Sequence, residues 1–180
     1  MSDVNGSGTH DRRADGSGAD EATADGVAAP ERASRCVLVV EDNPDDARLA
    51  VTALRSNRIV NEVVVARDGE EARDYLFGLG AYADRDPAQC PELVLLDLKL
   101  PKIDGLDVLR RMRADERTRY TPVVVLTSSD EDEDVVRSYR LGANSFVRKP
   151  VDFEQFIDAL QQASLYWLVI NVKPGGSAGG

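Results

Sequence analysis

The stretch that decides the fold is "PELVLLDLKLPKIDG", which runs from Pro91 to Gly105. Its apolar residues predict a buried strand that ends in a carboxylate, Asp97, followed by Pro101 and an Asp-Gly turn. An Asp at the end of a strand is often a turn or helix-cap residue. Whether Asp97 has a chemical role instead depends on what the rest of the chain places beside it.

Four other short runs have the character of this strand. They are rich in Val or Leu and nearly continuous in hydrophobicity, as expected of parallel strands that are covered on both faces. The five predicted strands are "CVLVV" at 36–40, "NEVVVA" at 61–66, "ELVLLD" at 92–97, "PVVVL" at 122–126 and "SFVRK" at 145–149.

Helical patterns separate the predicted strands. Asn43-Pro44 opens the first helix, and residues 68–71, "DGEE", have the form of a capping box before the second. Three more helices are predicted over 105–112, 131–141 and 152–170. Strands that alternate with helices in this way predict an α/β fold with a doubly wound, five-stranded parallel sheet and five helices on its two faces.

The chain length and composition set the domain organisation. At 180 residues the chain suits one domain with tails. Residues 1–34 hold almost no large apolar side chains, which predicts a disordered, acidic, Gly- and Ala-rich tail. Residues 35–172 form the predicted domain, and residues 173–180 a second flexible tail.

Composition also excludes several classes of function. The chain has 22 basic and 32 acidic residues, a net charge of −10, which disfavours binding to nucleic acid. It has no apolar run long enough to span a membrane and no secretion signal, so we expect a cytoplasmic protein without membrane attachment. The single His10 and two widely spaced cysteines support neither a zinc site nor a histidine-based triad.

Polar residues follow the ends of four of the five predicted strands. Glu41 and Asp42 follow the first strand, Asp97 ends the third, Thr127 the fourth and Lys149 the fifth. In open parallel sheets, ligands bind beyond the carboxyl ends of the strands, so we expect these side chains to lie close together.

This set of side chains suits one reaction. Adjacent carboxylates repel one another, and a hard cation such as Mg²⁺ with oxygen ligands removes that conflict. A carboxylate can also accept a phosphoryl group, whose oxygens would then need the metal, the Lys149 ammonium and the Thr127 hydroxyl. The strand ends therefore predict a site for phosphoryl transfer to a carboxylate.

Four motifs in this chain resemble the receiver domain of two-component response regulators. They are "VVED" at 39–42, "LLDLKLPKIDG" at 95–105, "VVLTSS" at 124–129 and "FVRKP" at 146–150, and the resemblance covers residues 35–170. "VEDNPDDARL" and "YWLVIN" further resemble the small, stand-alone receivers associated with phytochrome-type kinases. The resemblance implies a flavodoxin-like strand order of 2-1-3-4-5.

The resemblance also implies a role for each site residue. Asp97 is expected to be the phosphoacceptor. Asp42 and Asp97 are expected to bind Mg²⁺ directly, together with the backbone carbonyl of Lys99, while Glu41 acts through a water molecule.

Three more residues are implied to sense the phosphoryl group. Thr127 is expected to hydrogen-bond to it, Lys149 to pair with it, and Phe146 to be the switching aromatic residue. The donor would be a sensor histidine kinase, and the chain would have no enzymatic activity beyond self-phosphorylation and autodephosphorylation. Because no second domain follows residue 172, output is expected through protein contact, a phosphorelay or action as a phosphate sink.

The last predicted helix is apolar on two sides. Its 3-and-4 spacing turns Phe153, Phe156, Leu160 and Leu168, among others, toward the sheet. Apolar residues that continue around the other side predict a homodimer or partner contact on the face made by the fourth helix, fifth strand and fifth helix. The residues assigned to this contact are Tyr166, Trp167, Val169 and Ile170. The alternative is that this segment folds back on its own domain.

Three other functions remain open at this stage. A phosphatase of the haloacid dehalogenase type also uses an aspartyl phosphate, but it needs a second Asp where this chain has Lys99. A nucleotide-binding module should have a Gly-rich loop after its first strand, where this chain has "EDNPDD". A receiver that works without phosphorylation is the third, although every residue that the chemistry needs is present.

Overall fold

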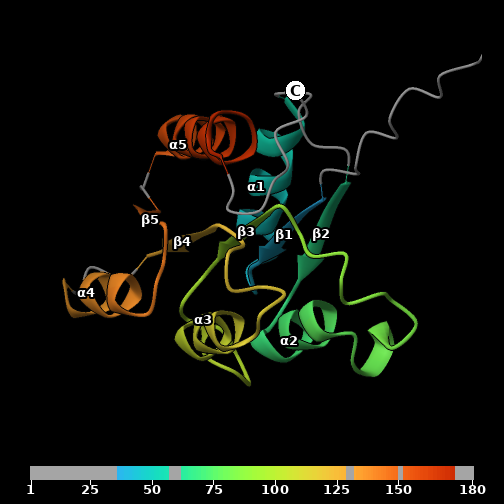
Figure 1. The fold of residues 1–180 in the computed structure, drawn as a ribbon. Helices are drawn as coiled ribbons and strands as arrows, with labels where there is room; N and C mark the ends of the chain where they lie inside the picture. The colour runs from blue at the N-terminus through green and yellow to red at the C-terminus, as the bar shows by residue number, and fades with distance from the viewer. Residues whose placement is uncertain (1–35, 57–61, 129–131, 150–151, 173–180) are drawn as a thin grey trace, which may run out of the picture. The chain divides into compact units, whose positions relative to one another are not determined.

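A computed structural model describes residues 36–56, 62–128, 132–149 and 152–172. Within them the strands β1 (Cys36–Val40), β2 (Glu62–Ala66), β3 (Leu93–Leu96), β4 (Val123–Thr127) and β5 (Ser145–Arg148) form one parallel sheet in the order β2-β1-β3-β4-β5 (Figure 1). This confirms the predicted fold class and strand order. The predicted tails, residues 1–34 and 173–180, lie outside the described residues.

The five predicted helices are present, with small differences at their ends. They are α1 (Pro44–Ser56), α2 (Gly69–Phe77), α3 (Gly105–Ala114), α4 (Asp132–Arg140) and α5 (Phe153–Leu165). The predicted last helix ends in a π-helical turn, η2 (Tyr166–Ile170), which continues α5. One short element was not predicted, the 3₁₀ turn η1 (Gly80–Tyr82). In the described part of the chain no helix is both long and apolar enough to cross a membrane.

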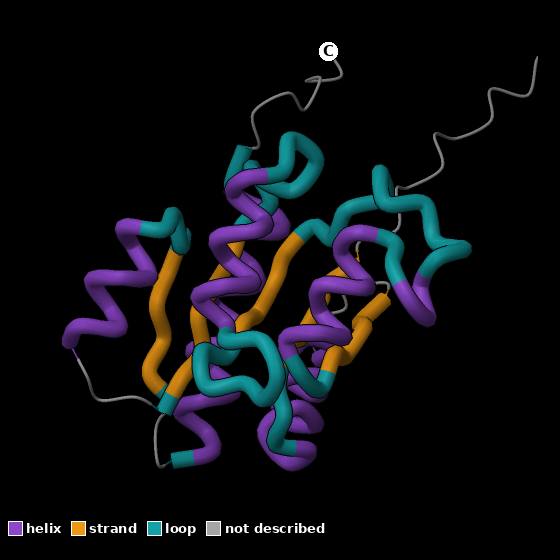
Figure 2. Tube along the Cα trace, turned by 90° about the horizontal axis from the view of Figure 1, so that it is seen from below, coloured by secondary structure: helices purple, strands orange, loops and turns teal. Residues whose placement is uncertain are grey.

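Helices cover both faces of the sheet, as Figures 1 and 2 show. Successive side chains of each strand point to opposite faces, so the strands supply two separate buried clusters. One cluster joins Val37, Val39 and Leu95 to α1 and α5; the other joins Leu38 and Leu96 to α2 and α3. This three-layer packing buries all the residues of β1, β3 and β4 and so fixes where those strands end.

Local hydrogen bonds explain where the first two helices begin. The Asn43 side chain accepts from the backbone N–H of Asp45 at 2.9 Å, which caps α1. Asp68 accepts from the backbone N–H of Glu71 at 2.8 Å, as the predicted capping box requires. The Glu71 carboxylate in turn accepts a hydrogen bond at 2.8 Å, but from the N–H of Arg67, one residue before the cap.

The sheet-facing side of α5 and η2 follows the prediction with one exception. Phe156, Leu160, Ser164 and Leu168 are buried, whereas the predicted sheet-facing Phe153 is 53% exposed. The prediction for Phe153 was wrong because this residue opens the helix, and the buried cluster on α5 begins one turn later at Phe156.

Candidate phosphoacceptor and metal site

The polar residues at the strand ends are held by the backbone of the sheet itself. The N–H of Glu41 donates to Ala66 O at 2.9 Å, that of Asp97 to Val40 O at 3.0 Å and that of Lys149 to Thr127 O at 2.9 Å. Each bond continues a strand ladder by one residue. The three side chains therefore leave the same edge of the sheet from fixed backbone positions.

Two of the acids are buried, which is unusual for a carboxylate. Glu41 is 4% and Asp97 5% exposed, while Asp42 is exposed. An ionised carboxylate that loses water needs a counter-charge or hydrogen bonds to compensate.

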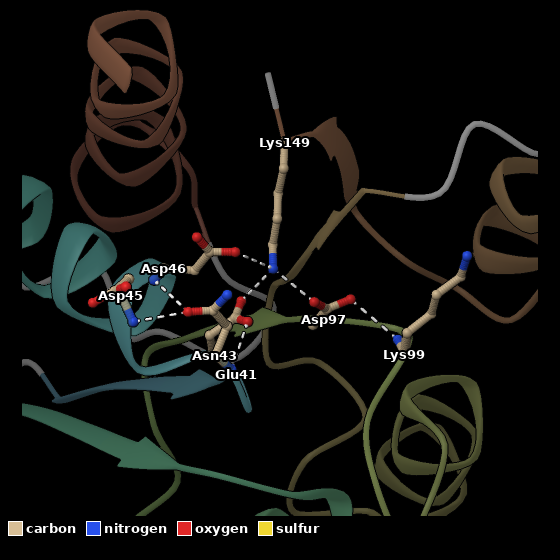
Figure 3. Close-up of polar contacts among 7 residues, drawn as sticks. All are labelled: Glu41, Asn43, Asp45, Asp46, Asp97, Lys99 and Lys149. Atoms are coloured by element: carbon tan, nitrogen blue, oxygen red, sulfur yellow. Dashed lines mark hydrogen bonds and ion pairs between the residues drawn. The ribbon is translucent and has the colours of Figure 1, made fainter. Parts of the chain in front are cut away.

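Lys149 supplies the counter-charge. Its Nζ lies 2.7 Å from Asp97 Oδ2, 2.5 Å from Glu41 Oε2 and 3.0 Å from Asp46 Oδ2, and Figure 3 shows the ammonium between these three carboxylates. Asp46 was not predicted to take part. It lies in the first turn of α1, four residues after Asp42, which brings it back to the same edge of the sheet.

The second oxygen of each buried carboxylate accepts a backbone hydrogen bond. Glu41 Oε1 accepts from the N–H of Asn43 at 3.2 Å, and Asp97 Oδ1 from the N–H of Lys99 at 3.1 Å. The Lys99 side chain extends away from Asp97 in Figure 3. At Asp97, Lys99 therefore acts through its backbone.

Burial and charge act in opposite directions on this cluster. Burial raises the pKa of Glu41 to about 7, although the contact with Lys149 works against that shift. Burial alone would lower the pKa of Lys149, but hydrogen bonds to Asp97 and Glu41 outweigh it and raise this pKa above its ordinary value. Lys149 therefore stays protonated at neutral pH, whereas the protonation state of Glu41 changes near this pH.

The acids fit a divalent cation. Ligand oxygens of Glu41, Asp42 and Asp97 all lie within 4.8 Å of one another. With Asp46 beside them, the cluster holds four carboxylates and one ammonium, that of Lys149, which contacts three of the four, so the cluster keeps an excess of negative charge. Hard oxygen ligands with excess negative charge suit Mg²⁺ or Mn²⁺.

Thr127 lies at the carboxyl end of β4, whereas Phe146 is the second residue of β5, opposite Val125, and has different surroundings. Thr127 is the last residue of β4, fully buried and paired with Arg148 of β5. Phe146 is half-buried on β5, where it packs against the cluster that α2 and α3 share with the sheet. The structure thus brings Glu41, Asp42, Asp97 and Lys149 together, with Phe146 directed into the core.

The comparisons with known proteins agree with this geometry. The family model described as "Response regulator receiver domain" matches residues 37–161. The chain belongs to the response-regulator receiver family. Receiver domains are typically phosphorylated by a kinase, and they bind Mg²⁺ or Mn²⁺ at an acidic pocket.

Within this family, the chain is similar to stand-alone regulators that work with phytochromes. It is 36% identical over 134 residues to the response regulator Rcp1 of Synechocystis sp., covering 74% of this chain and 89% of Rcp1. Among solved structures, the phosphorylated cyanobacterial phytochrome response regulator RcpA has a TM-score of 0.73 at 37% identity, covering 79% of this chain and 99% of RcpA. The bacteriophytochrome response regulator AtBRR is 54% identical with a TM-score of 0.61, covering 77% of this chain and 98% of AtBRR.

Proposed function

We propose that this protein is a phosphorylation switch in which Asp97 accepts a phosphoryl group from a sensor histidine kinase in the cytoplasm. The observation that carries the proposal is the position of Asp97. It is a buried carboxylate at a strand end, held by the Lys149 ammonium on one oxygen and by the Lys99 N–H on the other. A residue with only a turn or cap role would not need the ammonium of a half-buried lysine as its partner.

The transfer follows from these contacts. An oxygen of Asp97 forms a bond to phosphorus while the bond from phosphorus to the kinase histidine nitrogen breaks, and that nitrogen keeps the electron pair. Asp97 loses its own negative charge and gains that of the phosphoryl oxygens. The Lys149 ammonium, already at 2.7 Å from Asp97, can pair with those oxygens, and the Thr127 hydroxyl at the adjacent strand end can donate to them.

We assign the cation site to Asp42, Asp97 and the backbone carbonyl of Lys99 as direct ligands, with Glu41 acting through a water molecule. A bound Mg²⁺ would neutralise charge on the phosphoryl oxygens as they approach the carboxylates. Without a cation the excess of negative charge around Asp97 opposes that approach. The separation of the ligand oxygens and the Mn(2+)-bound form of Rcp1 both support this assignment.

The switch is assigned to Thr127, Phe146 and α4. In the described part of α4, Ser138 is the one fully buried residue, so this helix is held by few core contacts. Elements with little buried apolar surface open and shift most readily. A hydrogen bond from Thr127 to the phosphoryl group would therefore shift the position of α4 at low energetic cost. The side chain of Phe146, on the neighbouring strand, would change its conformation at the same time.

The output is assigned to a homodimer or partner contact on the α4, β5 and α5 face. Exposed apolar residues follow this face, with Val136 and Tyr139 on α4 and Tyr166, Val169 and Ile170 beyond α5. Trp167, which the helical spacing also turns toward the sheet, is half-buried, and its indole N–H donates to Ser145 Oγ at 3.1 Å. Trp167 thus anchors the turn to β5, while its neighbours point outward.

Labelling with a small phosphoryl donor tests the proposal. We expect the wild-type protein to be phosphorylated by acetyl phosphate in the presence of Mg²⁺, as a mobility shift on a phosphate-affinity gel. Asp97→Asn is nearly isosteric but lacks the nucleophile, so it should give no shift. Equal labelling of both proteins would exclude Asp97 as the acceptor.

A further inference from the structure

The loop of residues 98–104, which connects Asp97 to α3 and carries Lys99, lies directly against the first turn of α2. The N–H of Gly69 faces Pro101 O at 3.4 Å. A Cβ atom placed on Gly69 would lie only 1.9 Å from Ile103 O, so a side chain at this position would collide with the loop backbone. The absence of a side chain at Gly69 is what permits this close packing.

A lysine fastens the same contact in an uncommon backbone conformation. Lys102 has a φ of 67°, in the left-handed region that favours Gly and Asn over other residues. Its Nζ lies 2.7 Å from Asp68 Oδ2 and 3.6 Å from Glu70 Oε2, both in or next to the first turn of α2. The ion pair gives a reason for a long cationic side chain where Asn or Gly would fit the backbone with less strain.

The other side of the loop is tied to the phosphoacceptor. The N–H of Lys99 donates to Asp97 Oδ1, and the N–H of Gly105 donates to Leu98 O at 2.9 Å. A Cβ atom on Gly105 would lie 2.1 Å from Asp97 O, so the loop closes tightly on its own start. The backbone of Lys99 is thus held between Asp97 and the contact with α2.

We propose that Asp68, Gly69 and Lys102 are positioning residues that hold this loop ready for the cation; this inference rests on the proposed metal site. The proposed ligand on the loop is the backbone carbonyl of Lys99. The direction of a carbonyl is set by the conformation of the loop backbone and not by the residue's own side chain. A loop already fixed by the contact with α2 loses little freedom when a cation binds. If the contact is broken, a smaller fraction of molecules presents the carbonyl correctly, and the apparent affinity falls by that fraction.

A double-mutant cycle with Asp68→Asn and Lys102→Asn isolates the ion pair. Asn is as good an N-cap as Asp, so α2 keeps its start, and Asn tolerates the left-handed conformation at position 102. Each single variant should weaken Mg²⁺ binding by about two- to fivefold, the range for one partly exposed ion pair. The double variant should bind Mg²⁺ no more weakly than Lys102→Asn alone, because that change already removes the contact with Asp68.

Mg²⁺ affinity is measured by calorimetric titration, with amide hydrogen exchange of residues 98–104 recorded in metal-free protein. For the Asp68→Asn and Lys102→Asn variants we expect faster exchange in this loop and unchanged exchange in β1 and β3. Asp107→Asn is the matched control, because Asp107 forms an exposed ion pair with Arg110 on α3. It should leave Mg²⁺ affinity and loop exchange as in the wild type.

The outcomes separate this inference from the proposed function. If the Asp68→Asn and Lys102→Asn variants bind Mg²⁺ as tightly as the wild type, the positioning role is wrong, but the proposed metal site is not affected. A loss of affinity that is equally large in Asp107→Asn would also overturn it. A wild-type protein without measurable Mg²⁺ affinity would overturn the metal site and this inference together.

Discussion

Lys149 Nζ lies 2.7 Å from Asp97 Oδ2, although the two residues are 52 positions apart and follow strands that are not neighbours. β4 lies between β3 and β5, so the long lysine side chain spans one strand to reach the carboxylate (Figure 3). Its ammonium is also the partner of Glu41 and Asp46. One ammonium is therefore the shared partner of three carboxylates.

Replacing Lys149 by Met should destabilise the metal-free protein by about 2 to 3 kcal/mol at pH 8, because buried carboxylates lose their counter-charge. Mg²⁺ should restore part of this loss, and it should bind the variant at least as tightly as the wild type because a competing cation is gone. Urea unfolding with and without Mg²⁺ measures both effects.

Arg148→Met is the control for this variant. Arg148 is the adjacent residue, and its ion pair with Asp132 is exposed, so the free energy of unfolding should change by less than about 0.5 kcal/mol. Equal stability of wild type and Lys149→Met in the absence of Mg²⁺ would contradict the assigned role of Lys149.

The stability of the metal-free protein should depend on pH through Glu41. The folded protein raises the pKa of this carboxyl from 4.5 to about 7, so it binds the proton more tightly than the unfolded chain does. The stabilising contribution is complete below pH 4.5 and is lost as the pH rises toward 7. The free energy of unfolding of the wild type should therefore fall relative to Glu41→Gln across this window.

Saturating Mg²⁺ provides the second arm of that experiment, since a cation favours the ionised carboxylate and should remove the difference in pH dependence. If the free energies of unfolding of wild type and Glu41→Gln follow parallel pH profiles without metal, the pKa of Glu41 is not raised in the folded protein.

Self-association should depend on the exposed apolar residues that follow α5. Ile170 is 61% exposed, so Ile170→Glu should leave folding intact but place a charge in the proposed contact. Sedimentation at increasing concentration, with and without a phosphoryl mimic, should show the wild type associating and this variant remaining monomeric.

Leu79→Glu is the control for association, because Leu79 is an exposed apolar residue next to η1 and away from α5. It should associate as the wild type does. A wild-type protein that stays monomeric at every concentration, with and without the mimic, excludes the dimer.

The sequence was informative where the chain obeys the geometry of a parallel sheet. Apolar runs marked the strands, and the end of each run marked where a side chain leaves the core, so the convergence of Glu41, Asp42, Asp97 and Lys149 could be predicted. The cap residues Asn43 and Asp68 likewise act over a few positions of sequence and were visible in advance.

Contacts that depend on tertiary placement could not be predicted in the same way. The hydrogen bond that Lys149 donates to Asp46 depends on which side of α1 faces the sheet edge and on the length of a side chain 103 positions away. No sequence pattern indicated a role for Lys102, since its backbone conformation and its contact with Asp68 are set by the packing of the loop on α2. Phe153 had the expected periodicity, but the buried cluster on α5 begins only one turn later, at Phe156. The hydrogen bond from Trp167 to Ser145 joins residues far apart in the sequence, so no local pattern indicated it.

The identity of the phosphoacceptor is the central claim, and locating the modified residue tests it most directly. Wild-type protein is incubated with acetyl phosphate and Mg²⁺, the acyl phosphate is trapped by reduction with borohydride, and the labelled peptide is sequenced by mass spectrometry. We predict modification at Asp97 alone, its absence in Asp97→Asn and without Mg²⁺, and normal labelling of Asp107→Asn. Modification at another carboxylate, or undiminished labelling of Asp97→Asn, would contradict the account.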